Sequence, residues 1–188
     1  MLSAAAAGHA QPFDNQLHQK RADVNRKIAI ITGASRGLGA NAALKLAARG
    51  TDLVLKSVFF LTQALVPLMA DGGRILNVSS GLTRFTLPGH SVYASMKGAV
   101  EVLTRYLAKE LGPRGIAVNT LAPGAIATDF GGGMVRDNPE VKAMIAASTA
   151  LGRVGLPDDI GDLIASLVSD DLRWVNAQRI EASGGIFI

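Results

Sequence analysis

Two side chains at a helical spacing, Tyr93 and Lys97, could carry acid–base chemistry. Residues four positions apart lie on one face of a helix, so the Lys97 ammonium would sit beside the Tyr93 phenol. A free tyrosine has a pKa of about 10, and a fixed cation stabilises the phenolate and lowers that pKa. The pair therefore predicts a tyrosine that can exchange a proton during catalysis. Taken alone it has an alternative interpretation, because such pairs also occur on many ordinary helices.

A glycine-rich turn provides a second candidate site. Gly33, Gly37 and Gly39 follow a continuous β-branched segment and precede a stretch with helical periodicity. Glycines at a strand-to-helix turn let the backbone approach a phosphate, and the helix N-terminus offers free N–H groups. The spacing matches neither the G-x-G-x-x-G dinucleotide pattern nor a P-loop, because no Lys-Ser/Thr pair follows. A tight turn without a ligand is the alternative.

A third candidate is the pair Ser79-Ser80, which ends the predicted strand 74–80. Ligands of open parallel sheets bind beyond the carboxyl ends of the strands, so these hydroxyls would face such a crevice. Ordinary turn residues would look the same in isolation. The combination in chain order, with a glycine turn, then a strand-end serine, then the Tyr-x3-Lys helix, favours a functional site over three unrelated features.

The elements that must position these residues alternate between strands and helices. Strands are predicted where apolar and β-branched residues run continuously, over 27–33, 51–55, 74–80, 115–124 and 178–185. Helices are predicted where apolar residues recur every three or four positions, over 34–50, 58–70, 91–111, 138–148 and 156–169. This alternation predicts an α/β fold with a parallel sheet and right-handed crossovers.

The three motifs together resemble the short-chain dehydrogenase/reductase family. TGASRGLG is similar to the family's cofactor turn, NVSS to its serine-bearing strand and YASMK to its Tyr-x3-Lys motif. Ser80 stands thirteen residues before Tyr93, a common family spacing, which selects Ser80 rather than Ser79 as the catalytic serine. VNTLAPGAIATDF resembles the nicotinamide-side loop. Within the family the sequence is most similar to the 3-oxoacyl-carrier-protein reductase type.

The resemblance also implies a domain organisation. It matches in two blocks, and it implies a Rossmann-like three-layer parallel sheet that is abbreviated by about two strand–helix units. Residues 1–25 are polar and small without a sustained period, and we expect a flexible arm there. We expect one dinucleotide-binding and catalytic domain over 26–188, with a first cofactor block over 26–55 and a catalytic block over 56–188.

The family's mechanism assigns a role to each motif. Tyr93 would donate a proton to a substrate carbonyl while hydride reaches its carbon, and Ser80 would hydrogen-bond the carbonyl oxygen. Lys97 would lower the pKa of Tyr93 and hold the nicotinamide ribose, so Tyr93 and Lys97 also count as cofactor-binding residues. The other cofactor-binding residues implied are Gly33, Ser35, Arg36, Gly37, Leu38 and Gly39 on the adenosine-phosphate side, and Pro123, Gly124, Ile126 and Thr128 on the nicotinamide side.

Arg36 bears on which cofactor is expected. An arginine inside the glycine turn is the family feature that favours a 2′-phosphate, so we expect NADP(H) rather than NAD(H). A solvated surface arginine is the alternative. Nothing in the sequence selects the carbonyl or alcohol substrate.

The chain departs from the family between the segments TDLVL and KSVFFLTQ. Two strand–helix units are missing there, on the order of 60–80 residues at roughly 30 residues per unit. They would include the acidic strand end that contacts adenine, the Asn-Asn-Ala-Gly strand and the family's catalytic asparagine. The missing fourth strand lies between the first and fifth strands of the family's sheet, at the crevice where the dinucleotide binds. Either those two strands pair directly, or TDLVL moves into the vacant position.

Composition excludes several other classes of protein. The chain has no cysteine, and its three histidines are dispersed, so we expect no metal site. Its net charge of +4 comes from scattered lysines and arginines without a basic stripe, so we expect no nucleic-acid partner. The apolar segment 58–69 is too short and too polar to span a bilayer, and we expect no membrane partner. A cytoplasmic location is the expectation.

Two function hypotheses follow. The first is an NAD(P)(H)-dependent oxidoreductase that interconverts a carbonyl and a secondary alcohol by Tyr-Lys-Ser acid–base catalysis. The second is a non-catalytic paralogue, splice product or gene-model fragment that acts as an oligomerisation partner. In both cases the family implies a homo-oligomer through helices 58–69 and 91–111.

Overall fold

The computed structural model describes residues 29–32 and 53–188. Its strands are β1 (Ala29–Thr32), β2 (Arg74–Val78), β3 (Ala117–Pro123) and β4 (Arg179–Ala182). Its α-helices are α3 (Leu53–Leu65), α4 (Ser91–Leu111), α5 (Met134–Asp137), α6 (Pro139–Ala147) and α7 (Pro157–Leu167). Short 3-10 helices are η2 (Val66–Leu68), η3 (Gly81–Thr83), η4 (Gly112–Arg114), η5 (Phe130–Gly133) and η6 (Asp170–Leu172).

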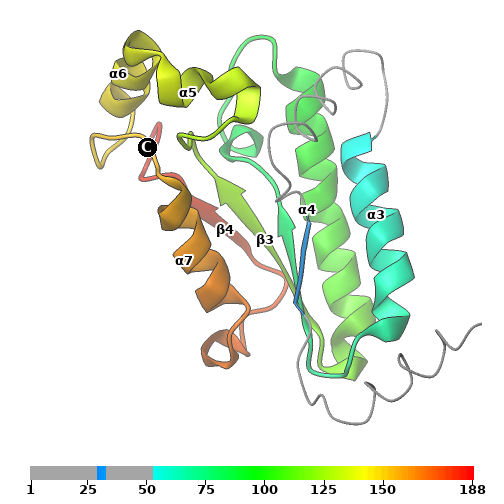
Figure 1. The fold of residues 1–188 in the computed structure, drawn as a ribbon. Coiled ribbons are helices and arrows are strands. Elements are labelled where there is room, and N and C mark those ends of the chain that lie inside the picture. Colours follow the sequence, from blue (N-terminus) through cyan, green and yellow to red (C-terminus); the bar gives the residue numbers. More distant parts are fainter. Residues whose placement is uncertain (1–28, 33–52) are drawn as a thin grey trace, which may run out of the picture.

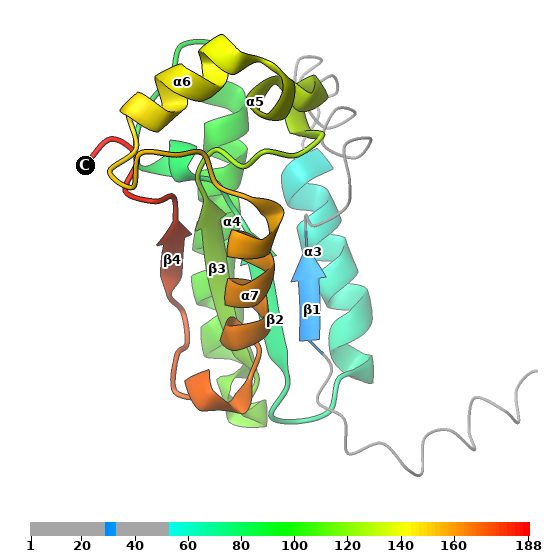
Figure 2. The ribbon, with the colours of Figure 1, turned by 60° about the vertical axis from the view of Figure 1, so that its left-hand side comes forward.

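The four strands form one parallel sheet in the order β1-β2-β3-β4. Ala29 of β1 pairs with Arg74 of β2, and Arg74 pairs with Ala117 of β3. β1 thus lies directly beside β2 (Figure 2). This is the first of the two arrangements expected from the deletion, because the position between these strands is closed by their own hydrogen bonds.

The strand predicted at 51–55 is wrong for the residues the structure describes. Leu53–Leu55 form the first turn of α3, which therefore begins earlier than the helix predicted from Val58. The hypothesis that TDLVL enters the sheet between β1 and β2 is also wrong. The direct β1–β2 pair closes the position between these strands, and in the helix the backbone N–H and C=O groups of Leu53–Leu55 are satisfied within the segment itself.

The described elements form three layers (Figure 1). α3 and α4 cover one face of the sheet, and α7 covers the other (Figures 1 and 2). Successive strand residues point to opposite faces of the sheet and contribute to a separate hydrophobic core on each face. Ile75 and Val118 pack with Met69 on the α3–α4 side, whereas Leu76 and Leu121 pack with α7. The three-layer parallel α/β fold is confirmed.

Most predicted elements are observed where their periodicity placed them. The helix over 91–111 is confirmed as α4, which buries Lys97, Val100, Thr104 and Ala108 at steps of three and four. α6 starts at Pro139 after Asn138, whose side chain accepts the N–H groups of Glu140 and Val141, as expected of an N-cap residue. α5 and α6 lie beyond the carboxyl ends of the strands (Figures 1 and 2).

Two sequence-based expectations fall on residues that are not described. The arm over 1–25 and the helix over 34–50 lie outside the described residues. In the part that is described, no helix is long and apolar enough to cross a membrane.

Candidate active site

Ser79 and Ser80 follow β2 and have different surroundings. The Ser79 hydroxyl is buried and donates to the Glu101 carboxylate at 2.7 Å. Ser80 caps the short helix η3, and its Oγ accepts the backbone N–H of Leu82 at 3.2 Å. Because a serine hydroxyl both accepts and donates, Ser80 still has its proton to give to a ligand or to a neighbouring side chain.

Tyr93 lies in the first turn of α4 and faces Ser80. Its side chain is half-buried, and its ring centroid is 6.2 Å from that of Phe130. Burial raises the pKa of the phenol above its ordinary value of 10, and a hydrogen bond with the Ser80 side chain acts in the opposite direction. The structure thus brings the two hydroxyls of the predicted site together.

Lys97 lies one helical turn after Tyr93 and is 8% exposed. Its Nζ donates to the Val78 carbonyl at the end of β2 over 2.8 Å and lies 5.7 Å from the Tyr93 ring centroid. Burial lowers the pKa of Lys97 to about 8, because the charged ammonium loses hydration. This hydrogen bond therefore links α4 to the carboxyl end of β2, which Ser80 follows.

The pKa effect expected from the Tyr93–Lys97 pair is not what the structure shows. The sequence predicts a phenol with a lowered pKa, whereas the Tyr93 pKa is raised. The ammonium lies 5.7 Å from the ring centroid, and it is itself poorly solvated. Desolvation therefore dominates. A raised pKa keeps the phenol protonated at neutral pH, which is the form that a proton donor needs.

The predicted nicotinamide-side residues lie in the loop that leaves β3. The Gly124 N–H donates to Ala182 of β4 at 2.9 Å, and a Cβ on Gly124 would stand 2.8 Å from the Ser183 Cα. Ile126 forms a parallel bridge to Gly155, and the Thr128 hydroxyl accepts the N–H of Phe130 at 3.2 Å. Pro123, which ends β3, completes this loop.

The predicted phosphate-side residues are not tested. Gly33, Ser35, Arg36, Gly37, Leu38 and Gly39 all lie outside the described residues. They follow β1, whose Thr32 pairs with Asn77 of β2.

The described residues fit the nicotinamide end of a dinucleotide. Lys97 has three N–H donors, of which one reaches the Val78 carbonyl, so a ribose hydroxyl can take another. Such a partner would offset the cost of burying the ammonium. Within 29–32 and 53–188 no cluster of three His, Asp or Glu side chains could hold a metal ion.

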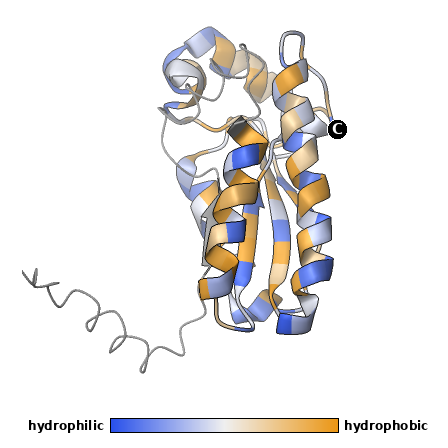
Figure 3. Ribbon diagram, turned by 90° about the vertical axis from the view of Figure 1, so that its right-hand side faces the viewer, coloured by the Kyte–Doolittle hydropathy of each residue, from blue (hydrophilic) through white to orange (hydrophobic). Residues whose placement is uncertain are grey.

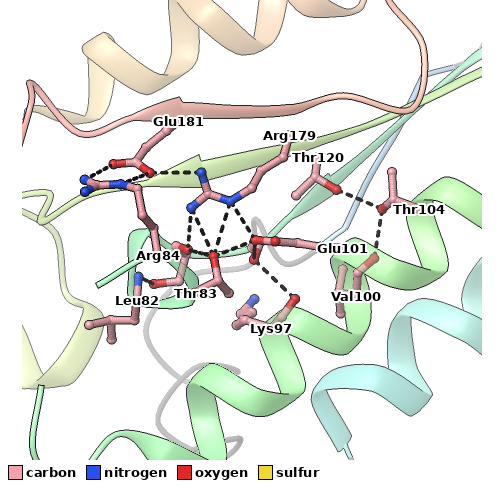
Figure 4. A network of polar contacts seen from close by, with 12 residues as sticks. Leu82, Thr83, Arg84, Lys97, Val100, Glu101, Thr104, Thr120, Arg179 and Glu181 are labelled. Atoms are coloured by element: carbon pink, nitrogen blue, oxygen red, sulfur yellow. Dashed lines mark hydrogen bonds and ion pairs between the residues drawn. The ribbon is translucent and has the colours of Figure 1, made fainter. Parts of the chain in front are cut away.

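The sequence did not predict two residues, Glu101 and Arg179, that support the turn containing Ser79 and Ser80 through hydrogen bonds. Glu101 accepts a hydrogen bond from the Ser79 hydroxyl, and Arg179 of β4 donates to Glu101 at 3.0 Å (Figure 4). One signal was available, because Glu101 stands four residues after Lys97 on the same face of α4. The arginine could not be found in this way, since Arg179 lies 78 positions from Glu101 in the sequence.

Comparisons with known proteins find similar oxidoreductases. A family profile described as enoyl-(acyl carrier protein) reductase matches residues 51–186. An uncharacterized oxidoreductase of Methylorubrum extorquens is 41% identical over 135 residues, which are 72% of this chain and 54% of that protein. The (3R)-3-hydroxyacyl-CoA dehydrogenase of Mus musculus is 40% identical over 138 residues, which are 71% of this chain and 52% of that protein.

A solved structure extends the similarity to the fold. The angucycline C-6 ketoreductase LanV with bound NADP superposes with a TM-score of 0.73 at 30% identity, covering 92% of this chain and 67% of that one. The chain spans about half the length of the curated relatives it matches.

Proposed function

Because the chain belongs to the short-chain dehydrogenase/reductase family, we propose that it interconverts a carbonyl and a secondary alcohol with NAD(P)(H), using Ser80, Tyr93 and Lys97. The observation that carries the proposal is the convergence of these three side chains at the carboxyl end of β2. The Ser80 side chain lies near enough to Tyr93 to act on the pKa of its phenol, and the Lys97 Nζ donates to the carbonyl of Val78, two residues before Ser80.

The chemistry follows from what each side chain can donate. The nicotinamide would supply hydride to the carbonyl carbon when bound. The Ser80 hydroxyl donates a hydrogen bond to the carbonyl oxygen and orients it. Tyr93, kept protonated by its raised pKa, delivers its proton to that oxygen as negative charge develops there. Lys97, which keeps N–H donors beyond the one that reaches the Val78 carbonyl, would hold the nicotinamide ribose beside this pair.

NADP(H) is the cofactor we favour over NAD(H). Arg36 in the glycine turn supports this choice from the sequence, and the similar ketoreductase LanV was solved with bound NADP. A small-molecule carbonyl or alcohol is the proposed substrate. Phe130 and Met134 are 43% and 57% exposed, and Phe130 contacts the Tyr93 ring, which supports a substrate with an apolar body.

The test is oxidation of NADPH by the purified chain with a series of ketones and aldehydes. We expect turnover that depends on the carbonyl compound, and a loss of about 100-fold or more in Tyr93→Phe, which lacks the proton. Tyr106→Phe is the matched control, because the other tyrosine is 65% exposed on the same helix and should be dispensable. Absence of carbonyl-dependent turnover with saturating NADPH would remove the proposed function.

A second candidate function is that of an oligomerisation partner. Two observations favour it. β1 pairs directly with β2, which closes the position of the family's missing strand. Moreover, helices α3 and α4 carry many hydrophobic residues (Figure 3), and several of their apolar side chains are exposed, among them Phe59, Phe60, Leu61, Val102 and Tyr106.

The exposed apolar side chains of α3 and α4 support the proposed homo-oligomer, whether or not the chain is active. Phe60 and Tyr106 are 58% and 65% exposed, so a partner helix pair could bury both. Light scattering of the wild type and of Phe60→Glu is the test. We expect an oligomer that dissociates in the variant, and a wild-type monomer would contradict the proposal.

A further inference from the structure

The carboxylate of Glu101 is the centre of a polar network behind the candidate serine (Figure 4). Its side chain is 12% exposed. One oxygen, Oε1, lies 2.7 Å from the Ser79 hydroxyl, 2.7 Å from the Thr83 hydroxyl and 3.0 Å from the Arg179 Nε. Three donors, one just after β2, one in η3 and one in β4, thus converge on one atom of helix α4.

These donors flank Ser80 on both sides. Ser79 directly precedes it, and Thr83 closes the η3 turn that follows it. The Thr83 hydroxyl also lies 2.9 Å from the Ser80 carbonyl oxygen. Each hydroxyl has one proton, and a carboxylate is the stronger acceptor. Glu101 therefore holds both ends of the turn on which the Ser80 side chain stands.

β4 holds the same turn from the opposite side. Arg179 places a second nitrogen 3.0 Å from the Thr83 hydroxyl and 3.4 Å from the Ser80 carbonyl oxygen. Its remaining donor binds Glu181 at 2.9 Å, and Glu181 in turn accepts hydrogen bonds from two nitrogens of the Arg84 side chain, Nε and Nη2, at 2.9 and 2.7 Å. The turn is therefore clamped between helix α4 and strand β4.

We propose that Glu101 is a positioning residue that fixes the Ser80 hydroxyl for the carbonyl oxygen, acting through Ser79 and Thr83. This role rests on the proposed reductase function. A largely buried carboxylate costs hydration and is weak evidence of stabilisation. The convergence of its hydrogen bonds on one turn is better explained by a role in orienting the Ser80 side chain, because a displacement of about 1 Å in a reacting group can lower the rate about 100-fold.

The first test compares Glu101→Ala with Glu101→Gln. Alanine removes the acceptor of both hydroxyls, whereas the glutamine amide oxygen can still accept them. We expect kcat to fall by about 10- to 100-fold in Glu101→Ala with little change in the KM for NADPH, and to be largely retained in Glu101→Gln. Glu110→Ala, an exposed position on the same helix, is the control. An equal loss in both Glu101 variants would overturn the proposal.

The second test asks whether the effect passes through Ser80. In a Ser80→Ala background, Glu101→Ala should change kcat by less than about twofold, because nothing is left to position. A merely structural role would make the two losses multiply, and that outcome would also overturn the proposal.

A third measurement does not depend on activity. Hydrogen exchange of the turn, residues 79–85, should quicken in Glu101→Ala and recover in Glu101→Gln, while β3 stays protected in both. Unchanged protection of the turn in Glu101→Ala would refute the proposal. If the wild type has no carbonyl-dependent turnover, the proposed function fails, and this exchange comparison still decides whether Glu101 anchors the turn.

Discussion

Replacing Lys97 with methionine should stabilise the folded protein at neutral pH while removing its activity. Lys97 is 8% exposed and carries an ammonium group, whose burial lowers its pKa from 10.5 to about 8. Methionine has a similar length and an apolar end that belongs in such surroundings. The substitution therefore separates what the lysine does for catalysis from what it costs in folding.

The magnitude follows from the size of the pKa shift. Each pKa unit corresponds to about 1.4 kcal/mol, so burying the charged form costs about 3 kcal/mol. Methionine also loses the hydrogen bond from Nζ to the Val78 carbonyl, worth about 1 kcal/mol net. We expect the free energy of unfolding to rise by about 2 kcal/mol at pH 7.

The pH dependence of stability independently checks the predicted direction of the change in the free energy of unfolding. The folded-state pKa of Lys97 lies below the unfolded value, so between pH 8 and 10.5 the unfolded chain binds more protons. The stability contributed by this group therefore rises with pH across that window, and its penalty is fully present below pH 8. The advantage of Lys97→Met should shrink over the same range and turn into a disadvantage of about 1 kcal/mol above it, because the lost hydrogen bond to the Val78 carbonyl then remains without the charge penalty.

Urea unfolding of the wild type and Lys97→Met at pH 7 and near pH 10.5 measures both quantities. Comparing the two proteins cancels the titration of all other groups. Lys109→Met, at an exposed site on the same helix, should give no stabilisation. A Lys97→Met protein that is less stable than the wild type at pH 7, or an advantage that does not change with pH, would refute the reasoning.

Three further substitutions test separate parts of the structure. Gly124→Ala should destabilise the fold by about 1–3 kcal/mol, because the added Cβ would lie 2.8 Å from the Ser183 Cα; thermal melting measures this, and an unchanged Tm would contradict it. Thr104→Val removes a buried hydroxyl that bonds both strands β2 and β3 at 2.9 Å, and urea unfolding should show a loss of about 1–3 kcal/mol. Hydrogen bonding from Arg84 lowers the pKa of Glu181 to about 2, so the stability it contributes is present above pH 4.5 and lost as pH falls toward 2. Acid titration of Glu181→Gln should lack that loss, and an acid transition identical to the wild type would show that the pair contributes nothing.

The regular elements could be predicted because their apolar periodicity is local. The spacing over 91–111 yields α4 and places Tyr93 and Lys97 on one face. The strand β2 is equally clear from its buried run, which brings Ser80 to the sheet edge. Family resemblance then selected Ser80 over Ser79, and in the structure Ser80 is the serine that meets Tyr93.

The remaining features depend on contacts that no local pattern encodes. Residues 53–55 have strand-like composition, yet they form the first turn of α3, and the position between β1 and β2 is closed by the pairing of those two strands. The clamp of Glu101 and Arg179 joins two segments far apart in the sequence. The Tyr93 pKa was predicted in the wrong direction, since burial depends on packing around the ring and not on the spacing of the pair.

Isotope transfer tests the central claim most directly. The full chain would be given NADPH with deuterium at both C4 positions of the nicotinamide together with the best carbonyl compound from the screen, and the mass of the alcohol formed would be determined by mass spectrometry. Catalysis by Ser80, Tyr93 and Lys97 predicts one deuterium per alcohol molecule with the wild type and almost no product with Tyr93→Phe. An alcohol without deuterium, or equal amounts of product from both proteins, would contradict the account.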